Sequence, residues 1–207
     1  MSGNLEVIVE IPGQPSGLGW LPDNSMLIIS MIDQKLMKLK DKELSIEADL
    51  SKLVHFHCND MVVAENGNAY IGNFGFNHEV EELKPTNLIL VRPGEEPCIA
   101  AEDLFFPNGA IITPDNKTLI IGETWAARIT AFDIEPDGSL SNRKVWAELS
   151  TIKEGYLPVL DGICLDEEGA VWMASPTTNE VIRIAEGAEV IETIKVDTNA
   201  YACMLGG

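Results

Sequence analysis

Three polar residues at regular intervals have the chemistry of a metal site. Asn59, Asn108 and Asp161 each stand directly before a short apolar run, and they recur about 50 residues apart. One carboxylate with two amide oxygens is a hard oxygen donor set, which suits Ca²⁺ or Mg²⁺ and suits structural zinc poorly. An ion held in this way polarises a carbonyl and stabilises the charge that develops on its oxygen. The three residues can do this only if the fold brings them to one place.

Each of these residues also has an ordinary structural explanation. Asn-Gly is the commonest hairpin dipeptide, so Asn108 could simply close a turn. An apolar run follows it, however, which favours the start of a strand. Asp161 could likewise cap a turn before a glycine, and Asn59 could hold the start of a strand. The neighbouring Asp60 is expected to hydrogen-bond the backbone.

The run from His55 to Cys58 contains two histidines and a cysteine, all of them zinc-ligand types. On a strand, His55 and His57 share one face while Cys58 points to the other, so the three side chains do not converge. A zinc site is therefore not expected there. His57 precedes Asn59 by two residues and is a candidate substrate contact, with an ordinary strand-end histidine as the alternative.

The elements that must position these residues form a repeat. Helical periodicity is almost absent, and short β-branched and apolar runs alternate with turns rich in Gly, Pro, Asn and Asp. Similar segments begin at residues 16, 59, 108 and 161, and each has a polar residue, an apolar run, a turn and a second apolar run. A third and a fourth strand are expected to follow in each repeat. Four antiparallel strands in a unit of about 48 residues are typical of a β-propeller blade.

The expected fold class is all-β, a propeller that forms a single domain over residues 1–207. Equivalent positions in a propeller lie at one height around a central channel, so the three polar residues are expected to converge at one end of it. Residues 5–11 are expected to form the outer strand of a partial first blade, and residues 201–207 half of an inner strand in a partial last blade. About four complete blades lie between them. Such an apparently partial chain exposes blade faces through which copies of it could self-associate.

Composition excludes several classes of function. The 207 residues include 14 Lys and Arg against 33 Asp and Glu, for a formal net charge of −19. Nucleic acids and anionic membrane surfaces are therefore not expected partners. No apolar run reaches the roughly 18 residues of a transmembrane helix, and the first residues lack the pattern of a secretion signal. Four widely spaced cysteines are too few for a disulfide scaffold, so a cytoplasmic protein is expected.

Several motifs in order, at the spacing of propeller blades, resemble the regucalcin/gluconolactonase family, also called the senescence-marker and luciferin-regenerating-enzyme family. The motifs that carry the resemblance are Asn59-Asp60, Phe106-Pro107-Asn108-Gly109, Thr113-Pro114-Asp115, Leu160 to Asp166, and Phe132-Asp133 with Pro136 to Arg143. The resemblance implies a propeller of the six-bladed type with one divalent metal, usually calcium, in its channel. Many members hydrolyse sugar lactones or related cyclic esters.

The resemblance also implies roles for individual residues. Asn108 and Asp161 match two of the metal-ligand positions of the family, and Asn59 matches an asparagine that contacts substrate. The third ligand is a glutamate in a Glu-Gly-Pro-like segment, and this chain has no such segment before Ser16. Members that bind sugar lactones often carry an arginine where this chain has His57. The expected ion is Ca²⁺, with Mg²⁺, Mn²⁺ or Zn²⁺ as alternatives.

The expected function is therefore that of a divalent-metal-dependent hydrolase of the gluconolactonase type, which opens a small-molecule lactone or similar cyclic ester. Asp161 is the expected catalytic residue as well as a metal ligand, and Asn59 and His57 are the expected substrate-binding residues. Two alternatives stay open. The chain could be a non-catalytic ligand-binding propeller, or an inactive fragment that lacks the glutamate ligand of the first blade.

Overall fold

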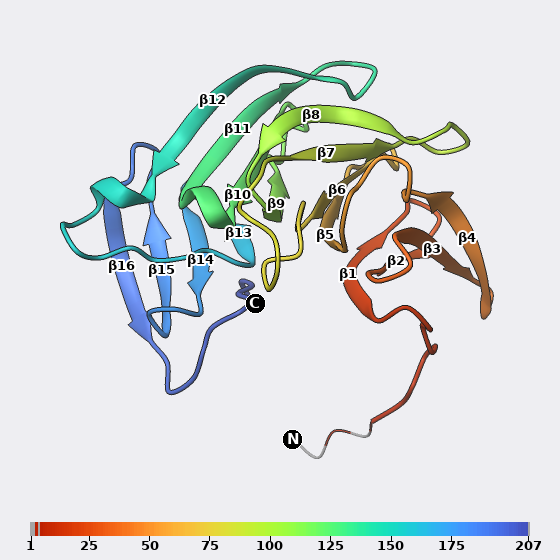
Figure 1. Cartoon of the computed structure of the whole chain (residues 1–207), viewed down its shortest axis with the longest axis horizontal. Helices are drawn as coiled ribbons and strands as arrows, with labels where there is room; N and C mark the ends of the chain where they lie inside the picture. Colours follow the sequence, from red (N-terminus) through yellow and green to blue (C-terminus); the bar gives the residue numbers. More distant parts are fainter. Residues whose placement is uncertain (1–2, 4, 207) are drawn as a thin grey trace.

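The computed structural model describes residue 3 and residues 5–206, which form an open arc of four antiparallel sheets (Figure 1). Each sheet contains four strands hydrogen-bonded in chain order. In sequence order the strands are β1 Pro15–Trp20, β2 Met26–Ser30, β3 Lys35–Lys40, β4 Glu43–Asp49, β5 Cys58–Val63, β6 Ala69–Asn73, β7 Thr86–Val91, β8 Cys98–Leu104, β9 Pro107–Ile112, β10 Thr118–Glu123, β11 Arg128–Ile134, β12 Leu140–Glu148, β13 Ile163–Leu165, β14 Val171–Ser175, β15 Glu180–Ile184 and β16 Val190–Lys195. Two short 3₁₀ helices, η1 Thr124–Ala126 and η2 Leu149–Thr151, follow β10 and β12.

The four sheets are the blades that the repeat predicts, and the all-β propeller class is confirmed. The first strand of each sheet lies on the inner side of the arc and the fourth on the outer side (Figure 1). The innermost strands contact one another in the order β1, β5, β9 and β13. The strands β1, β5 and β9 begin within one residue of the predicted repeat starts, whereas β13 begins two residues after Asp161.

Glycine lets neighbouring inner strands approach closely. A Cβ atom on Gly17 would lie 2.8 Å from the backbone nitrogen of Met61, and one on Gly109 would lie 2.5 Å from the carbonyl oxygen of Asp161. Real Cβ atoms essentially never come so close to backbone, so both positions require glycine. Each of these glycines follows directly the polar residue that opens its repeat. The spacing of the repeat therefore places a close contact between neighbouring inner strands directly after each of these polar residues.

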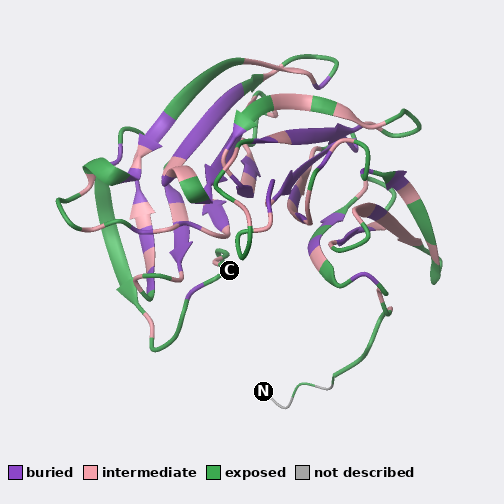
Figure 2. Cartoon of the chain, viewed as in Figure 1, coloured by how far each residue is buried: buried purple, intermediate pink, exposed green. Residues whose placement is uncertain are grey.

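The hydrophobic core lies between the sheets rather than within one layer. One cluster of buried side chains joins the first two sheets through Leu36 and Ile71, and a second joins the next pair through Leu88 and Ile121. A third, which includes Val171, packs the last two sheets together. Figure 2 shows this burial as purple strands along the inside of the arc. Each such side chain contributes about 2 kcal/mol through burial, so packing between blades stabilises the arrangement.

The two chain ends differ from the sequence-based expectation. Residues 5–11 form no strand, and Leu5 is almost fully exposed, because no neighbouring strand among the described residues satisfies this segment's backbone. Residues 201–206 are also not assigned as strand, and Gly207 lies outside the described residues. Even so, Gly162 donates its backbone N–H to the carbonyl of Tyr201 (2.9 Å), and the Cys203 thiol contacts the carbonyl of Trp172 (3.3 Å). This last segment therefore packs beside the fourth sheet where the next inner strand is expected.

Within the described residues, no helix is both long and apolar enough to cross a membrane.

Candidate metal and substrate site

A row of hydrogen-bonded side chains joins the starts of the first three inner strands. The Ser16 hydroxyl donates to the side-chain oxygen of Asn59 (3.2 Å), and the Asn59 amide donates to the side-chain oxygen of Asn108 (2.7 Å). These residues occupy equivalent positions in three successive blades. The predicted convergence of Asn59 and Asn108 is therefore confirmed. We call Ser16, Asn59 and Asn108 the polar row.

Asn108 is the most rigidly held member of the polar row. Its side chain is buried, with 3% of its surface exposed, and its amide nitrogen donates to the hydroxyl oxygen of Thr124 (3.1 Å). That hydroxyl in turn donates to the carbonyl oxygen of Leu160 (3.0 Å). These bonds tie the third blade to the segment that leads into the fourth. They also fix the orientation of the Asn108 amide, because each amide group has one donor and one acceptor end.

Asp161 continues the polar row into the fourth blade. Its backbone is held by a bond from its N–H to the carbonyl of Ala174 (3.0 Å), and its carboxyl is half-buried. Burial and, to a smaller extent, the nearby Asp60 carboxylate raise the pKa of Asp161 to about 6, against the opposing effect of the Asn108 amide. Asp161 therefore lies beside both Asn108 and Asp60. The repeat predicts its proximity to Asn108.

Asp60 gives the site a second carboxylate. Burial raises its pKa as well, and the bond it accepts from the Met61 N–H (2.9 Å) opposes that shift. In the described part of the chain, neither Asp60 nor Asp161 makes a salt bridge. Two carboxylates without a cationic side chain repel each other, and a bound dication would relieve that repulsion. The expected hydrogen bond between Asp60 and the backbone is confirmed, but its proximity to Asp161 was not anticipated.

The donor set fits a hard divalent cation. The available donors are the carboxylates of Asp60 and Asp161 and the amide oxygens of the polar row, all of them oxygen. No three His, Cys, Asp or Glu side chains cluster as a ready-made site anywhere in the described ranges, so amide oxygens and water would complete the ion's coordination. The nitrogen donor of His55 is engaged elsewhere, because its Nε2 pairs with the Glu81 carboxylate (3.1 Å).

His57 lies at the same end of the strands but does not join the polar row. Its ring stacks on Phe56 with 3.9 Å between ring centroids, and its carbonyl oxygen accepts the N–H of Phe74 (3.0 Å). The side chain is half-buried, two residues before Asn59. The structure thus places His57 near the predicted substrate contact Asn59 within an aromatic environment that the sequence interpretation missed.

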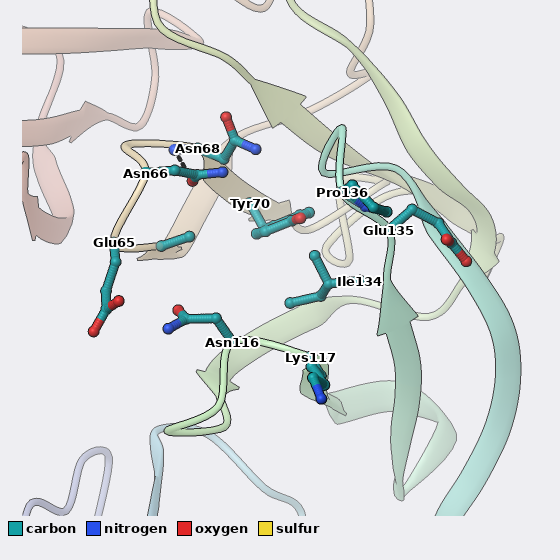
Figure 3. Close-up of a pocket in the computed structure, with 10 residues that line it drawn as sticks. Glu65, Asn66, Asn68, Tyr70, Asn116, Lys117, Ile134, Glu135 and Pro136 are labelled. Atoms are coloured by element: carbon teal, nitrogen blue, oxygen red, sulfur yellow. Dashed lines mark hydrogen bonds between the residues drawn. The ribbon is translucent and has the colours of Figure 1, made fainter.

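A separate cavity lies at the opposite end of the inner strands. It has a volume of about 460 Å³ and is bordered by the turns around Asn66, Asn116 and Glu135, with Tyr70 and Ile134 between them (Figure 3). None of the predicted site residues lines it. Strand β5 begins beside Asn59 and ends at the turn that borders this cavity, so the two places are separated by the length of the strand.

A second cavity of about 480 Å³ follows the inner strands themselves. It is lined by Asp60 and Gly162 from the site, by Trp20, and by Ala202 and Cys203 from the last segment. The cavity therefore reaches Asp60 from the inner side of the arc. Ala202 extends this lining because its segment lies beside Gly162.

Comparison with known proteins fits this arrangement. The family model described as the SMP-30/Gluconolactonase/LRE-like region matches residues 1–207. The chain belongs to this family. Among curated members, chicken (Gallus gallus) regucalcin is 27% identical over 159 residues, covering 72% of this chain and 50% of the relative. The chain therefore spans about half the length of the curated relatives it matches.

Solved structures of the SMP-30/gluconolactonase/LRE-like family share the fold. Regucalcin from Agrobacterium tumefaciens, described as a calcium-binding protein, superposes with a TM-score of 0.75 at 24% identity, covering 91% of this chain and 62% of the other. A gluconolactonase from Xanthomonas campestris superposes with a TM-score of 0.58 at 19% identity, covering 95% of this chain and 81% of the other. At these identities the likeness establishes the propeller architecture.

Proposed function

We propose that this chain carries the site of a divalent-metal-dependent hydrolase that opens a lactone or similar cyclic ester. The observation that carries the proposal is the polar row, which ends beside the paired carboxylates of Asp161 and Asp60. Membership of the SMP-30/gluconolactonase/LRE-like family supports it, as do a relative described as calcium-binding and another described as a gluconolactonase. Ca²⁺ is the proposed ion.

Asp161 and Asn108 are the proposed metal ligands. Their oxygens are of the kind that calcium prefers, and the negative charge shared by Asp161 and Asp60 attracts a dication. An ion bound there supplies Lewis-acid chemistry, which polarises an ester carbonyl and stabilises negative charge on its oxygen. The buried hydrogen bond from Asn108 to Thr124 keeps this ligand in place without the ion.

Asp161 is also the proposed proton acceptor. Its carboxyl is ionised at neutral pH, because its pKa without the ion is about 6 and a bound cation would lower that pKa. It would take the proton of the attacking water. Asn59 lies between Ser16 and Asn108, and its amide is oriented by both of them. It would therefore present a fixed polar group to the ring oxygens of the substrate.

Lactone hydrolysis with matched variants tests this proposal. Release of acid from a set of neutral and sugar lactones is followed in a pH-stat with Ca²⁺, with EDTA, and for the Asp161→Asn variant. Asp41→Asn is the control, because Asp41 is an exposed carboxylate in the turn between β3 and β4. We expect hydrolysis that is lost with EDTA and in Asp161→Asn and kept in Asp41→Asn. Hydrolysis that survives in Asp161→Asn would contradict the proposal.

A regucalcin-like role in calcium binding without hydrolysis is the second candidate. It is favoured by the same oxygen donors and by the calcium-binding description of the Agrobacterium relative. Calcium binding that depends on Asp161, with no lactone hydrolysed by the parent chain, would select this candidate.

A further inference from the structure

An aromatic cluster stands directly beside the polar row. It consists of Phe56, His57, Phe74, Phe76, His78, Phe106 and Trp125. Phe74 stacks on Phe106 with 4.2 Å between ring centroids, and the Phe74 ring lies nearly parallel to that of His78 at 6.2 Å. The ring of Trp125 lies 6.1 Å from Phe106 and 6.3 Å from His78. The rings therefore form one continuous group contributed by several separate loops.

The backbone ties this aromatic cluster to the polar row. His57 precedes Asn59 by two residues, and Phe106 precedes Asn108 by two. Trp125 directly follows Thr124, whose hydroxyl holds the Asn108 amide. The rings and the polar row thus occupy the same end of the inner strands.

The aromatic cluster has a buried base and an open edge. Phe76 and Phe106 are buried, His57 and Phe74 are half-buried, and Trp125 keeps 41% of its surface exposed. Phe106 adopts a φ of 55°, in the left-handed region that is unfavourable for a bulky residue. A conformation of this kind persists only where the surroundings enforce it, and here it places the ring next to that of Trp125, tilted by 37°. The exposed indole therefore rests on a fixed support.

Charge at this end of the molecule disfavours an anionic ligand. No Lys or Arg belongs to the aromatic cluster or to the polar row. In the adjoining loop, Lys84 is paired with Glu81 (3.2 Å), which also accepts the N–H of Asn77 (2.8 Å). These contacts hold the pKa of Glu81 at about 2, so its charge persists at neutral pH. The available ligand-binding surface is therefore aromatic and without a free cation.

We propose that the aromatic cluster is a specificity subsite for neutral cyclic esters that carry an aromatic or alicyclic ring, in preference to polyhydroxylated sugar lactones. Such a ring would lie against Trp125 and His57, while its ester group reaches Asn59 and Asp161. Aromatic faces bind flat apolar rings well and give little to a ligand whose hydroxyl groups need hydrogen-bond partners. The inference rests on the proposed hydrolase function and names its substrate class.

Binding of a ligand that cannot be hydrolysed tests this subsite separately from catalysis. The probe is 3,4-dihydroquinolin-2-one, a neutral aromatic lactam, titrated calorimetrically in the presence of Ca²⁺ against δ-valerolactam, which lacks the aromatic ring. The variants are Trp125→Ala, Trp125→Phe as the conservative change, and Ile46→Ala as the control. Ile46 is also a large exposed apolar residue, 57% exposed, but it lies on β4, away from the aromatic cluster and the polar row.

We expect the aromatic lactam to bind the parent at least about tenfold more tightly than δ-valerolactam, a typical gain for one well-placed aromatic contact. Trp125→Ala should remove that preference, whereas Trp125→Phe and Ile46→Ala should retain it. Equal binding of the two lactams, or a preference that survives in Trp125→Ala, would overturn the subsite.

The two proposals fail in different ways. A Trp125-dependent preference for the aromatic lactam without hydrolysis of any lactone supports the subsite and overturns the hydrolase. Hydrolysis that depends on Asp161 but shows equal kcat/KM for dihydrocoumarin in the parent and in Trp125→Ala supports the hydrolase and overturns the subsite.

Discussion

The side-chain amide of Asn59 donates a 2.7 Å hydrogen bond to the side-chain oxygen of Asn108, across 49 residues of sequence and from one blade to the next. Both residues open an inner strand, and the strands are in direct contact. The bond shows that equivalent positions of the repeat meet in space. It also explains why these two polar side chains can lie at the edge of a hydrophobic core, since they are hydrogen-bonded to each other.

Replacing Asn108 by alanine should destabilise the fold more than replacing Asn59. Asn108→Ala removes the acceptor of the Asn59 amide N–H and the donor to the Thr124 hydroxyl oxygen, both next to the buried Asn108 position. We expect a loss of about 2 kcal/mol in the free energy of unfolding. Asn59→Ala, at a half-buried position, should cost about 1 kcal/mol or less. Urea denaturation of the two variants measures the difference, and equal losses would contradict the central place given to Asn108.

Glu123 should be the most sensitive acidic residue for stability. Its side chain is fully buried, and it accepts bonds from Arg128 (2.8 Å), Thr130 (2.5 Å) and the Phe105 N–H (2.9 Å). Glu123→Gln should cost about 3 kcal/mol, because it removes the buried charge with which the partly exposed Arg128 and Arg143 are paired. The exposed carboxylate of Glu186, which pairs with Lys144, is the matched control. Glu186→Gln should change the free energy of unfolding by less than about 0.5 kcal/mol.

The lowered pKa of Glu123 should also affect how steeply the protein unfolds in acid. Burial alone would raise the pKa of Glu123, but the bonds from Arg128 and Thr130 outweigh it and lower the pKa below the ordinary 4.5. The stabilisation is therefore present above pH 4.5 and is lost as the pH falls through the folded-state pKa. Acid unfolding followed by circular dichroism should be less steep in Glu123→Gln than in the parent. An unchanged acid transition would contradict this assignment.

Asp161 should titrate with a pKa of about 6 in the metal-free protein, against an ordinary value of 3.8. Within that interval the folded state holds a proton that the unfolded state has lost, so the free energy of unfolding decreases as the pH rises. Carbon-13 NMR of the aspartate carboxyls measures the midpoint. Asp60→Asn should lower it, because a repelling charge is removed, while burial keeps it above 3.8. A midpoint unaffected by Asp60→Asn would show that the two carboxylates do not interact.

Gly109→Ala should disrupt the contact between the third and fourth blades. The added methyl group would lie 2.5 Å from the Asp161 carbonyl and 2.7 Å from the Ile163 nitrogen, both of them backbone atoms that cannot turn away. We expect a cost of about 3 kcal/mol from this overpacking. Gly94→Ala is the control, since a methyl group there meets open space and only the positive φ of 75° opposes it. That change should cost about 1 kcal/mol. Equal thermal shifts would contradict the close approach of β9 to the Asp161 segment.

Much of the fold was predictable because similar sequence segments recur along the chain at the spacing of propeller blades. The inner strands, their turns and the meeting of Asn59 with Asn108 all follow from equivalent positions in successive blades. Side-chain proximity set by loops was not predictable. The aromatic cluster depends on the left-handed backbone of Phe106, and the pairing of Asp60 with Asp161 depends on which way two half-buried carboxyls turn.

The segments outside the complete blades were harder to interpret. A pattern of alternating apolar residues over 5–11 indicates a strand only if a neighbouring strand completes its hydrogen bonds, and none among the described residues does so. Thr124 was also missed as a positioning residue, because nothing in its local sequence distinguishes it from other threonines. Its position directly after β10, one residue beyond the buried Glu123, is the only signal the chain offers.

Calcium binding measured by isothermal titration calorimetry at pH 7.5 tests the central claim most directly. The parent chain and Asp41→Asn should bind Ca²⁺ with one site per chain. Asp161→Asn should lose at least about tenfold in affinity, because it removes a carboxylate ligand from an all-oxygen site. Calcium binding by Asp161→Asn that matches the parent, or no binding by the parent itself, would contradict a metal site beside the polar row.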